Sequence, residues 1–372
     1  MTGTTVPAAR PVVTGLGVLS ACGHGPGPLA EATARGRAVF DTVTRFDVTG
    51  RRVRRAALLP DAPPLAEAVL AAVGDACRQA ALPGADDDGA TPLLLALHSD
   101  LDTTGVAARI AEGARRQWGI PAVTRVYTGA CVAAGTAVAD AAALIASGRR
   151  ERVLVAAGHL VGAGVYAAFD AGRALARDGE VRPFSAGRTG TLLGDAAVAV
   201  VLESRAGAER RGAPVLAEVS GWGRAGDAYH VCRPVPDGTG LARAISSALR
   251  RGGITPDQVG YVNANATGSP LADQAEANAL RRVFGDHTDR LPVSSTKGVH
   301  GHALEASALL ELAVTIAALH SGKLPVNAGW TDRDEDCRLD LVLDRPRPIR
   351  PRYALTVNSA FGGANTALLV AA

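Results

Sequence analysis

The chain has 372 residues, of which 47% are hydrophobic and 4% aromatic, and its formal net charge at pH 7 is +3. This length predicts about two domains or one duplicated domain, and so weak a charge imbalance argues against a nucleic-acid-binding protein. The five cysteines are widely spaced without a CxxC pair, which argues against a disulfide framework and a metal site. Without a signal-peptide pattern or a run of about 20 apolar residues, we expect a cytoplasmic protein that does not enter a membrane.

Apolar runs and helical periodicities alternate along the first half of the chain. Strands are expected at residues 12–14, 91–98, up to 127, 152–158 and 197–202, and helices at 29–35, 64–82, 106–118 and 133–147. Gly15-Leu16-Gly17 follows the first apolar run, and we expect a tight turn there because the spacing of a dinucleotide-binding fingerprint is not completed. Asp86-Asp87-Asp88 is expected in a surface turn.

The second half repeats this alternation. Strands are expected at residues 217–222, 260–263, 291–296, 353–358 and 366–370, and helices at 240–251, 271–284 and 303–321. Strand–helix–strand units at this spacing predict an α/β fold built on parallel strands. Two similar halves, residues 1–215 and 216–372, are expected to share their central helices between two sheets. Ligands of such folds bind where loops at the strand ends meet, so we expect the site at the seam between the halves.

Cys131 lies in the stretch VYTGACVAAG, residues 126–135, which is typical of a strand, a sharp turn and a helix start. A thiol at a helix N-terminus is exposed to the positive end of the helix dipole, which lowers its pKa, and the free N–H groups there can bind an oxyanion. A free cysteine is also commonly a small, inert, buried hydrophobe. The local sequence leaves both interpretations open.

Six blocks of the sequence, in this order, resemble motifs of the β-ketoacyl synthase family, the condensing enzymes of the thiolase fold. The blocks are residues 11–23 (PVVTGLGVLSACG), 128–131 (TGAC), 182–195 (with RPF, Arg188 and Gly194-Asp195), 263–273 (NANATGSPLAD), 297–302 (KGVHGH) and 361–365 (FGGAN). The resemblance covers nearly the whole chain. It implies a thiolase-like α-β-α-β-α layered sandwich whose first half carries the nucleophile and whose second half carries the Asn, Lys and His groups.

The family's chemistry implies a role for each matching residue. Cys131 takes an acyl chain from a carrier-protein thioester. In the family, two histidines promote loss of carbon dioxide from the malonyl group. His302 matches the second of these histidines, and Lys297 matches the lysine that supports it. Backbone N–H groups of Cys131 and Phe361 form the oxyanion hole, and Phe361 also gates the site. No cofactor is implied, since acyl groups arrive on the phosphopantetheine arm of the acyl carrier protein.

Three departures from the family pattern bear on the chemistry. Asn265 stands where the family has its first histidine, and an amide can donate a hydrogen bond but cannot exchange a proton at neutral pH. Glu305 replaces a glycine, and its charge would repel a malonyl group unless it points away. Ser307 replaces an alanine. The stretch between residues 98 and 127 also looks short for the family, as does the final turn at Phe361.

Further residues are expected behind the site. Glu311 matches a family glutamate, and Thr267 belongs to the block that contains Asn265. His300 is an extra histidine, expected to support the site or to lie on the surface. His159 and His320 belong to no motif and are expected to be structural or solvated.

Three functions remain open from the sequence. The favoured one is a ketosynthase-like acyltransferase, of type II polyketide or fatty-acid systems, that loads Cys131 and passes the chain to an acceptor with impaired decarboxylation. The second is a decarboxylative 3-oxoacyl-[acyl-carrier-protein] synthase that uses Asn265 and His302. The third is a non-catalytic partner that resembles chain-length factors, although those usually lack the cysteine. An acyl carrier protein is the expected partner, together with a homodimer or a heterodimer with another ketosynthase-like subunit.

Overall fold

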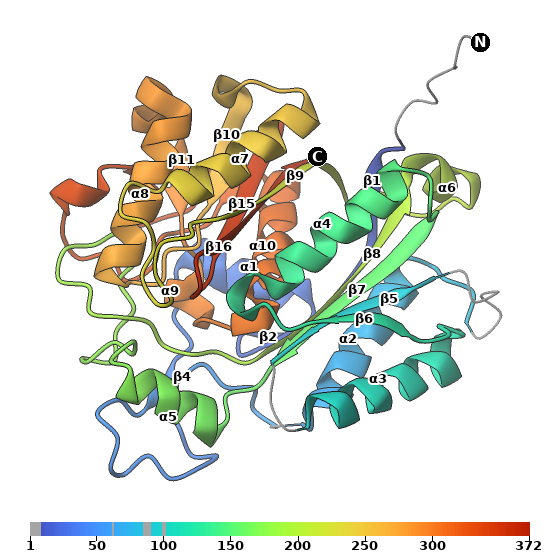
Figure 1. The fold of residues 1–372 in the computed structure, drawn as a ribbon, viewed down its shortest axis with the longest axis horizontal. Helices are drawn as coiled ribbons and strands as arrows, with labels where there is room; N and C mark the ends of the chain where they lie inside the picture. Colours follow the sequence, from blue (N-terminus) through green and yellow to red (C-terminus); the bar gives the residue numbers. More distant parts are fainter. Residues whose placement is uncertain (1–8, 62, 85–90, 99–101) are drawn as a thin grey trace.

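The computed structural model describes residues 9–61, 63–84, 91–98 and 102–372. The acidic run Asp86–Asp88 lies outside the described residues. The model is an α/β structure in which most strands join one twisted sheet, with helices on its outer faces and two helices between its halves (Figure 1). This is the thiolase-like architecture expected from the sequence, except that the two expected sheets are joined into one by the pairing of the two halves.

Both halves of the sheet follow the same strand order. From the middle outward, the first half runs β1 (Pro11–Ser20), β8 (Ala196–Ser204), β7 (Arg152–His159), β5 (Leu93–Leu97) and β6 (Val123–Tyr127). The second half runs β9 (Ala217–Gly226), β16 (Ala364–Ala371), β15 (Tyr353–Ser359), β10 (Val259–Asn263) and β11 (Pro292–Ser294), with β13 (Asp340–Leu341) added at its edge. In each half the inner pairs are antiparallel and the outer pairs parallel.

The two halves meet where β1 pairs with β9. The antiparallel pairing is short, with Val12 opposite Glu218 and Val13 opposite Ala217. Because equivalent strands occupy equivalent places on the two sides of this junction, the ends of β5, β6 and β7 have counterparts at the ends of β10, β11 and β15. The two sides of the junction therefore share one strand order.

The helices complete the layers. Those of the first half are α1 (Pro26–Arg35), α2 (Leu65–Gln79), α3 (Thr103–Trp118), α4 (Ala133–Ala146), α5 (Ala163–Ala171) and α6 (Arg205–Arg210). Those of the second half are α7 (Thr239–Gly252), α8 (Pro270–Phe284), α9 (Lys297–His300) and α10 (Ser307–Ser321). In Figure 1, α2 and α3 cover one outer face, α7 and α8 cover the other, and α4 and α10 lie between the two halves. The alanine-rich sequence of α4 suits this close central packing, since most of its side chains are buried.

Short elements fill the connections. Besides β13, the two-residue strands are β2 (Gly23–His24), β3 (Asp41–Thr42), β4 (Arg55–Ala56), β12 (Lys323–Leu324) and β14 (Arg347–Pro348). Short 3-10 helices occur at η1 (Ala130–Val132), η2 (Pro256–Gln258), η3 (Gly285–Arg290), η4 (Leu304–Ala306) and η5 (Glu335–Cys337). The turn η2 is closed by a capping box between Thr255 and Gln258.

The predicted turn at Gly15 and Gly17 was wrong. Both glycines lie inside β1, which continues to Ser20. They permit a close strand–helix approach, because a methyl group on Gly17 would lie 1.9 Å from the carbonyl oxygen of Ala72 in α2. The second half repeats the arrangement, since a methyl group on Gly223 of β9 would lie 1.8 Å from the carbonyl oxygen of Ala244 in α7. A glycine inside a strand can therefore mark a close backbone approach instead of a turn.

The segment from Leu304 to Ser321 is long and apolar enough to cross a membrane by length and composition, but 83% of it is buried inside the protein. It packs as the central core helix of the second half.

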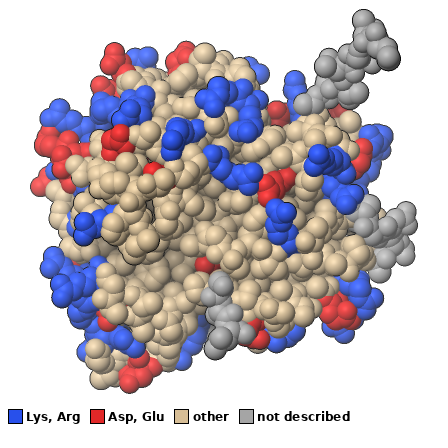
Figure 2. Space-filling view, viewed as in Figure 1, with Lys and Arg blue, Asp and Glu red and all other residues tan. Residues whose placement is uncertain are grey.

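On the surface, acidic and basic side chains occur close together around most of the face shown in Figure 2. In the arginine cluster at residues 51–55, Arg52 pairs with Asp170 at 3.3 Å and Arg55 with Glu180 at 2.5 Å.

Candidate active site

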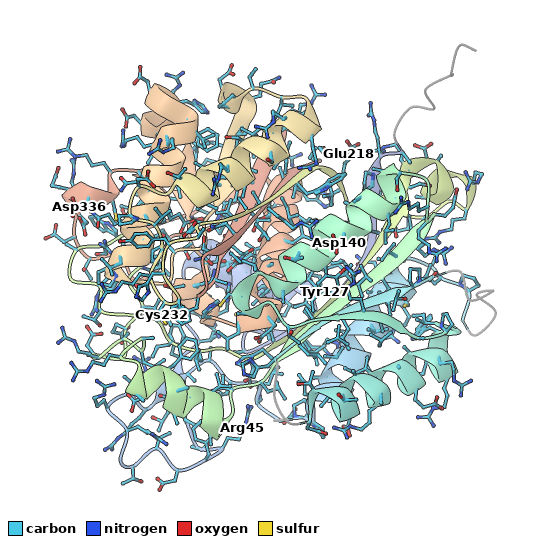
Figure 3. The ribbon with its side chains drawn as sticks, in the orientation of Figure 1. Arg45, Tyr127, Asp140, Glu218, Cys232 and Asp336 are labelled. Carbon is cyan, nitrogen blue, oxygen red and sulfur yellow. The ribbon has the colours of Figure 1, made fainter. Side chains whose placement is uncertain are left out.

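Cys131 lies where the chain turns from β6 into α4. Ala130, one residue earlier, has a φ of 50°, and the single turn η1 carries the cysteine to the N-terminus of the helix. Tyr127 at the end of β6 donates a hydrogen bond of 2.8 Å to Asp140 on α4, and both are labelled in Figure 3. This bond joins the strand to the helix across the turn. The predicted strand–turn–helix at Cys131 is confirmed.

His302 faces the thiol. Its Nε2 lies 3.0 Å from Sγ of Cys131, and both side chains are buried. The backbone of His302 donates to the carbonyl of Leu192 at 2.8 Å and accepts from the N–H of Gly194 at 3.0 Å. A methyl group on Gly194 would lie 2.1 Å from the carbonyl oxygen of His300, so only glycine permits this approach. The loop before β8 therefore sets the position of His302.

The site holds the thiol and the imidazole in their neutral forms. Burial and the nearby charge of Glu305 raise the pKa of Cys131 to about 12, and Lys297 offsets this only in part. Burial and the charge of Lys297 hold the pKa of His302 well below its ordinary value. The expectation that the helix dipole would lower the thiol pKa was wrong, because loss of solvation outweighs the dipole at this depth.

Ser307 supports His302 from behind, with its Oγ 2.9 Å from Nδ1. A serine hydroxyl can donate or accept. When it accepts from Nδ1–H, Nε2 is left as the acceptor that can take the proton of the Cys131 thiol. The replacement of a family alanine by Ser307 thus adds a hydrogen bond that fixes the orientation of the imidazole.

A second buried cluster joins the ends of β10, β11 and β15. Lys297 and Glu311 form an ion pair with both side chains fully buried. Lys297 Nζ also donates to Oδ1 of Asn265 at 3.2 Å, and Glu311 Oε2 accepts from Asn358 at 2.6 Å. Asn263 donates to the backbone carbonyl of Glu311 at 3.2 Å. The expected support of His302 by Lys297 is not a hydrogen bond, because Lys297 binds Asn265 and acts on His302 only through its charge.

This cluster fixes the orientation of the Asn265 amide. An ammonium group only donates, so the atom beside Lys297 is the amide oxygen and Nδ2 is the remaining donor. The backbone N–H of Asn265 donates to Glu276 at 2.7 Å. Thr267 is held through its backbone, which donates to Asp273 at 3.1 Å.

Phe361 lies at the rim of the site. Its side chain is 53% exposed, and its ring centroid is 6.0 Å from that of Phe169 in α5. The turn around it is closed by backbone bonds, from Gly362 to the carbonyl of Val231 at 2.8 Å and from Gly363 to Ala360 at 3.1 Å. An exposed ring on a turn of this kind suits the gate expected from the resemblance, a role that stays a prediction.

Glu305 is at the centre of a group that the sequence did not predict. Its Oε1 lies 2.9 Å from Nδ1 of His98, at the end of β5, and its Oε2 lies 3.5 Å from Nδ1 of His159, at the end of β7. Burial would raise the Glu305 pKa, but His159 and His98 lower it below its ordinary value. Its charge still acts on Cys131. His159, expected to be structural or solvated, is buried against a charged partner.

His300 is fully buried and is not on the surface. Its ring nitrogens contact Thr296 Oγ1 at 3.0 Å and the carbonyl of Gly301 at 2.8 Å, and burial lowers its pKa to about 3. It lies in α9, so its backbone, rather than its ring, is the part packed against Gly194.

His320 is exposed and bonds to the carbonyl of Leu216. Within the described part of the chain, no group of three or more His, Cys, Asp or Glu side chains could hold a metal ion.

Comparison with known proteins identifies the family. Models of the β-ketoacyl synthase N-terminal and C-terminal domains match residues 95–208 and 216–331. Nodulation protein E of Rhizobium meliloti is 41% identical over 244 residues, 65% of this chain and 60% of that protein. 3-Oxoacyl-[acyl-carrier-protein] synthase 2 of Coxiella burnetii is 39% identical over 189 residues, 51% of this chain and 46% of that protein.

The match to curated relatives thus spans about half to 60% of their length. Among solved structures, the ishigamide ketosynthase/chain length factor is 28% identical with a TM-score of 0.90, covering 98% of this chain and 99% of that one. Together, the two family models and the shared architecture show that the chain belongs to the β-ketoacyl synthase family.

Proposed function

We propose that this protein is an acyltransferase that takes an acyl chain from an acyl carrier protein onto Cys131 and passes it to an acceptor. The observation that carries the proposal is the buried pair of Cys131 Sγ and His302 Nε2, 3.0 Å apart. A nucleophile and a base at this distance, with the base held from behind by Ser307, form the arrangement needed for covalent catalysis.

Loading begins from a neutral pair. As Sγ attacks the thioester carbonyl carbon, the thiol proton passes to Nε2 of His302, so no thiolate has to exist beforehand in this apolar setting. The developing oxyanion is expected to bind backbone N–H groups of Cys131 and Phe361. The tetrahedral intermediate then expels the phosphopantetheine thiolate, which takes the proton back from His302.

Decarboxylation is expected to be impaired. The position of the first family histidine is occupied by Asn265, whose amide oxygen is held by Lys297. Loss of one positioned acid–base group typically lowers a rate ~100- to 10,000-fold. The charge of Glu305, which already raises the Cys131 pKa, also opposes a negatively charged malonyl group or enolate.

One observation favours decarboxylative condensation as the second candidate. Because Lys297 fixes the amide oxygen, Nδ2 of Asn265 is the donor left to bind a thioester carbonyl beside His302. Two donors would then stabilise an enolate, as in a 3-oxoacyl-[acyl-carrier-protein] synthase. A non-catalytic partner is the third candidate, in keeping with the name of the ishigamide ketosynthase/chain length factor. Retention of the Cys131–His302 pair weighs against it.

The partners follow from the same proposal. The relative named 3-oxoacyl-[acyl-carrier-protein] synthase 2 supports an acyl carrier protein as donor. We expect a homodimer or a heterodimer with another ketosynthase-like subunit, working in polyketide or fatty-acid synthesis in the cytoplasm. The edge strand β6 offers a surface for such pairing, with Val126 37% exposed.

Intact-mass analysis with acyl carrier proteins tests the proposal. The wild type is expected to gain one acyl mass, and Cys131→Ala is expected to gain none, since loading on the thiol falls by more than ~1,000-fold without its nucleophile. Malonyl carrier protein is added in a second step. Acyl loading without an elongated product supports transfer, an elongated β-ketoacyl product overturns it in favour of condensation, and no loading with any chain favours the non-catalytic partner.

A further inference from the structure

A pocket opens at the ends of β5 and β7 and the start of α5. Its volume is about 330 Å³, near the lower end of the range for small-molecule sites. His98 and His159 supply its polar wall, and Leu65, Leu160 and Val165 supply its apolar wall. Glu305 joins the two imidazoles from beneath.

The polar wall of this pocket is incomplete. His159 is 2% exposed, yet within the described part of the chain its Nε2 has no hydrogen-bond partner. Nδ1 of His159 faces the Glu305 carboxylate at 3.5 Å, so the ring proton sits on Nδ1 and Nε2 is an acceptor. A ligand that satisfies Nε2 must carry an O–H or N–H group.

The pocket wall is joined to the elements that hold the nucleophile. Val161, two residues after His159, is buried in the same apolar cluster as Cys131 and Leu304, and Val165 of the pocket wall packs against that cluster. Glu305, which contacts both pocket histidines, follows His302 by three residues, and its charge acts on the Cys131 thiol. The same group of residues therefore supports the pocket and Cys131.

We propose that this pocket binds the acceptor of the acyl group, a hydroxyl- or amine-bearing small molecule, and that His159, oriented by Glu305, is the base that activates it. The inference rests on the acyl transfer proposed above. Nε2 of His159 takes the O–H or N–H proton as the oxygen or nitrogen bonds to the acyl carbon. The carbon–Sγ bond then breaks, and the proton on His159 returns through solvent to the Cys131 thiolate, giving an ester or amide and a free thiol.

Discharge of the acyl-enzyme tests this inference separately from loading. Cys131 is first acylated from an octanoyl carrier protein and the mass gain recorded. Ethylene glycol or ethylenediamine is then added as the probe, with 1,2-dimethoxyethane as the matched control that lacks O–H. The wild type is expected to lose its acyl group at least ~10-fold faster with the probes than with the control. His159→Gln is expected to load normally but to lose ~100-fold or more of this acceleration, together with the pH dependence of discharge.

Other variants keep the inference open to contradiction. His24→Gln, which changes a solvated histidine paired with Asp75, serves as the control and is expected to behave as the wild type. If His159→Gln does not fold, the discharge rate of Glu305→Gln tests the role of His159 instead. If Glu305 acts through His159, the variant discharges slowly, whereas if it acts only on Cys131, a lower thiol pKa makes a better leaving group and discharge is faster.

Three results overturn the inference. One is normal discharge by a His159→Gln enzyme that loads normally. Another is a His159→Gln enzyme whose preference for acyl-chain length during loading changes while its discharge does not, which would make the pocket an acyl-chain site. The third is equal discharge with the probes and with 1,2-dimethoxyethane. Failure of the wild type to load at all contradicts the proposed function itself, and the loading step detects this on its own.

Discussion

Two buried glutamates, both supplied by the second half of the chain, lie beside the ends of the parallel strands, but the protein satisfies their oxygens differently. Glu311 serves the second half, where Lys297 and Asn358 satisfy its two oxygens and every partner is buried. Glu305 serves the first half, where His98 is bound and 37% exposed, and Oε2 has only a 3.5 Å contact with His159. One cluster is closed by the protein, and the other borders a pocket.

The Glu311 cluster is therefore a fixed part of the site, and the Glu305 cluster is an open part. The paired contacts of Lys297 with Glu311 and Asn265 hold the Asn265 amide in one orientation, although Oε2 of the neighbouring Glu276 has no partner among the described residues. Buried acceptors without partners are costly unless a ligand or water satisfies them, so such atoms are typical of binding sites. The duplicated scaffold is therefore the same on both sides, while the chemistry at the strand ends has diverged.

The largest expected effect is a difference in the free energy of unfolding between variants of the two glutamates. Glu311→Gln leaves the buried Lys297 without its counter-charge, and we expect a loss of about 3–5 kcal/mol in the free energy of unfolding. Glu305→Gln keeps a hydrogen-bonding group beside His98 and His159 and leaves no buried lysine without its counter-charge, so we expect a smaller loss. Chemical denaturation measures both. Equal losses would contradict the division into a closed and an open cluster.

The duplicated glycines test how far the halves are equivalent. Gly17→Ala and Gly223→Ala each force a methyl group against a helix carbonyl, at 1.9 and 1.8 Å, and we expect each to lower the free energy of unfolding by about 1–3 kcal/mol. Gly50→Ala, which places its methyl group in open space, is the control, with an expected change within about 0.5 kcal/mol. A large loss for one glycine alone would show that the halves are not equivalently packed.

The closed cluster should also leave a mark on the pH dependence of stability. Burial raises the pKa of Glu276, which accepts from Asn265, to about 8 from an ordinary value of 4.5. Between these pH values the unfolded chain releases the proton and the folded chain keeps it. The free energy of unfolding therefore falls as the pH rises, by at most ~1.4 kcal/mol per unit. Glu276→Gln should flatten this fall in denaturation at pH 5 and pH 8, and an unchanged slope would show that Glu276 is not its source.

The smallest expected effect is on the reactivity of Cys131. The charge of Glu305 helps to raise the thiol pKa, so Glu305→Gln should lower it and speed alkylation by iodoacetamide at a given pH. A change of one pKa unit corresponds to roughly a tenfold change in thiolate below the pKa. Mass spectrometry follows Cys131 and the exposed Cys232, labelled in Figure 3, as an internal reference. Equal rates at Cys131 in both proteins would show that Glu305 does not act on the thiol.

The sequence predicted what depends on local pattern. Alternating apolar runs identified the two α/β halves, and the motif positions brought Cys131, His302, Lys297 and Asn265 to one site. The role of Gly17 was misjudged because a glycine pair after a short apolar run looks the same in a turn and in a strand packed on a helix. The pKa of Cys131 was predicted in the wrong direction because burial depends on distant segments.

The open cluster could not have been assembled from spacing. Glu305 was noted as a departure from the family, but His98 and His159 come from the ends of two separate strands, and His98 is 207 residues from Glu305. No local pattern connects them. The order of the strands supplies the missing signal, since β5 and β7 are neighbours and end on the same edge.

Release of carbon dioxide from malonyl carrier protein, measured for the wild type and for Asn265→His, tests the central claim most directly. The claim is that the chain on Cys131 is transferred without decarboxylation because an amide stands at the position of the first histidine. The account predicts release by the wild type at least ~100-fold slower than by Asn265→His, which regains an imidazole at that position. Release by the wild type at the same rate as by the variant, with an elongated β-ketoacyl product, would contradict the account and identify a condensing enzyme.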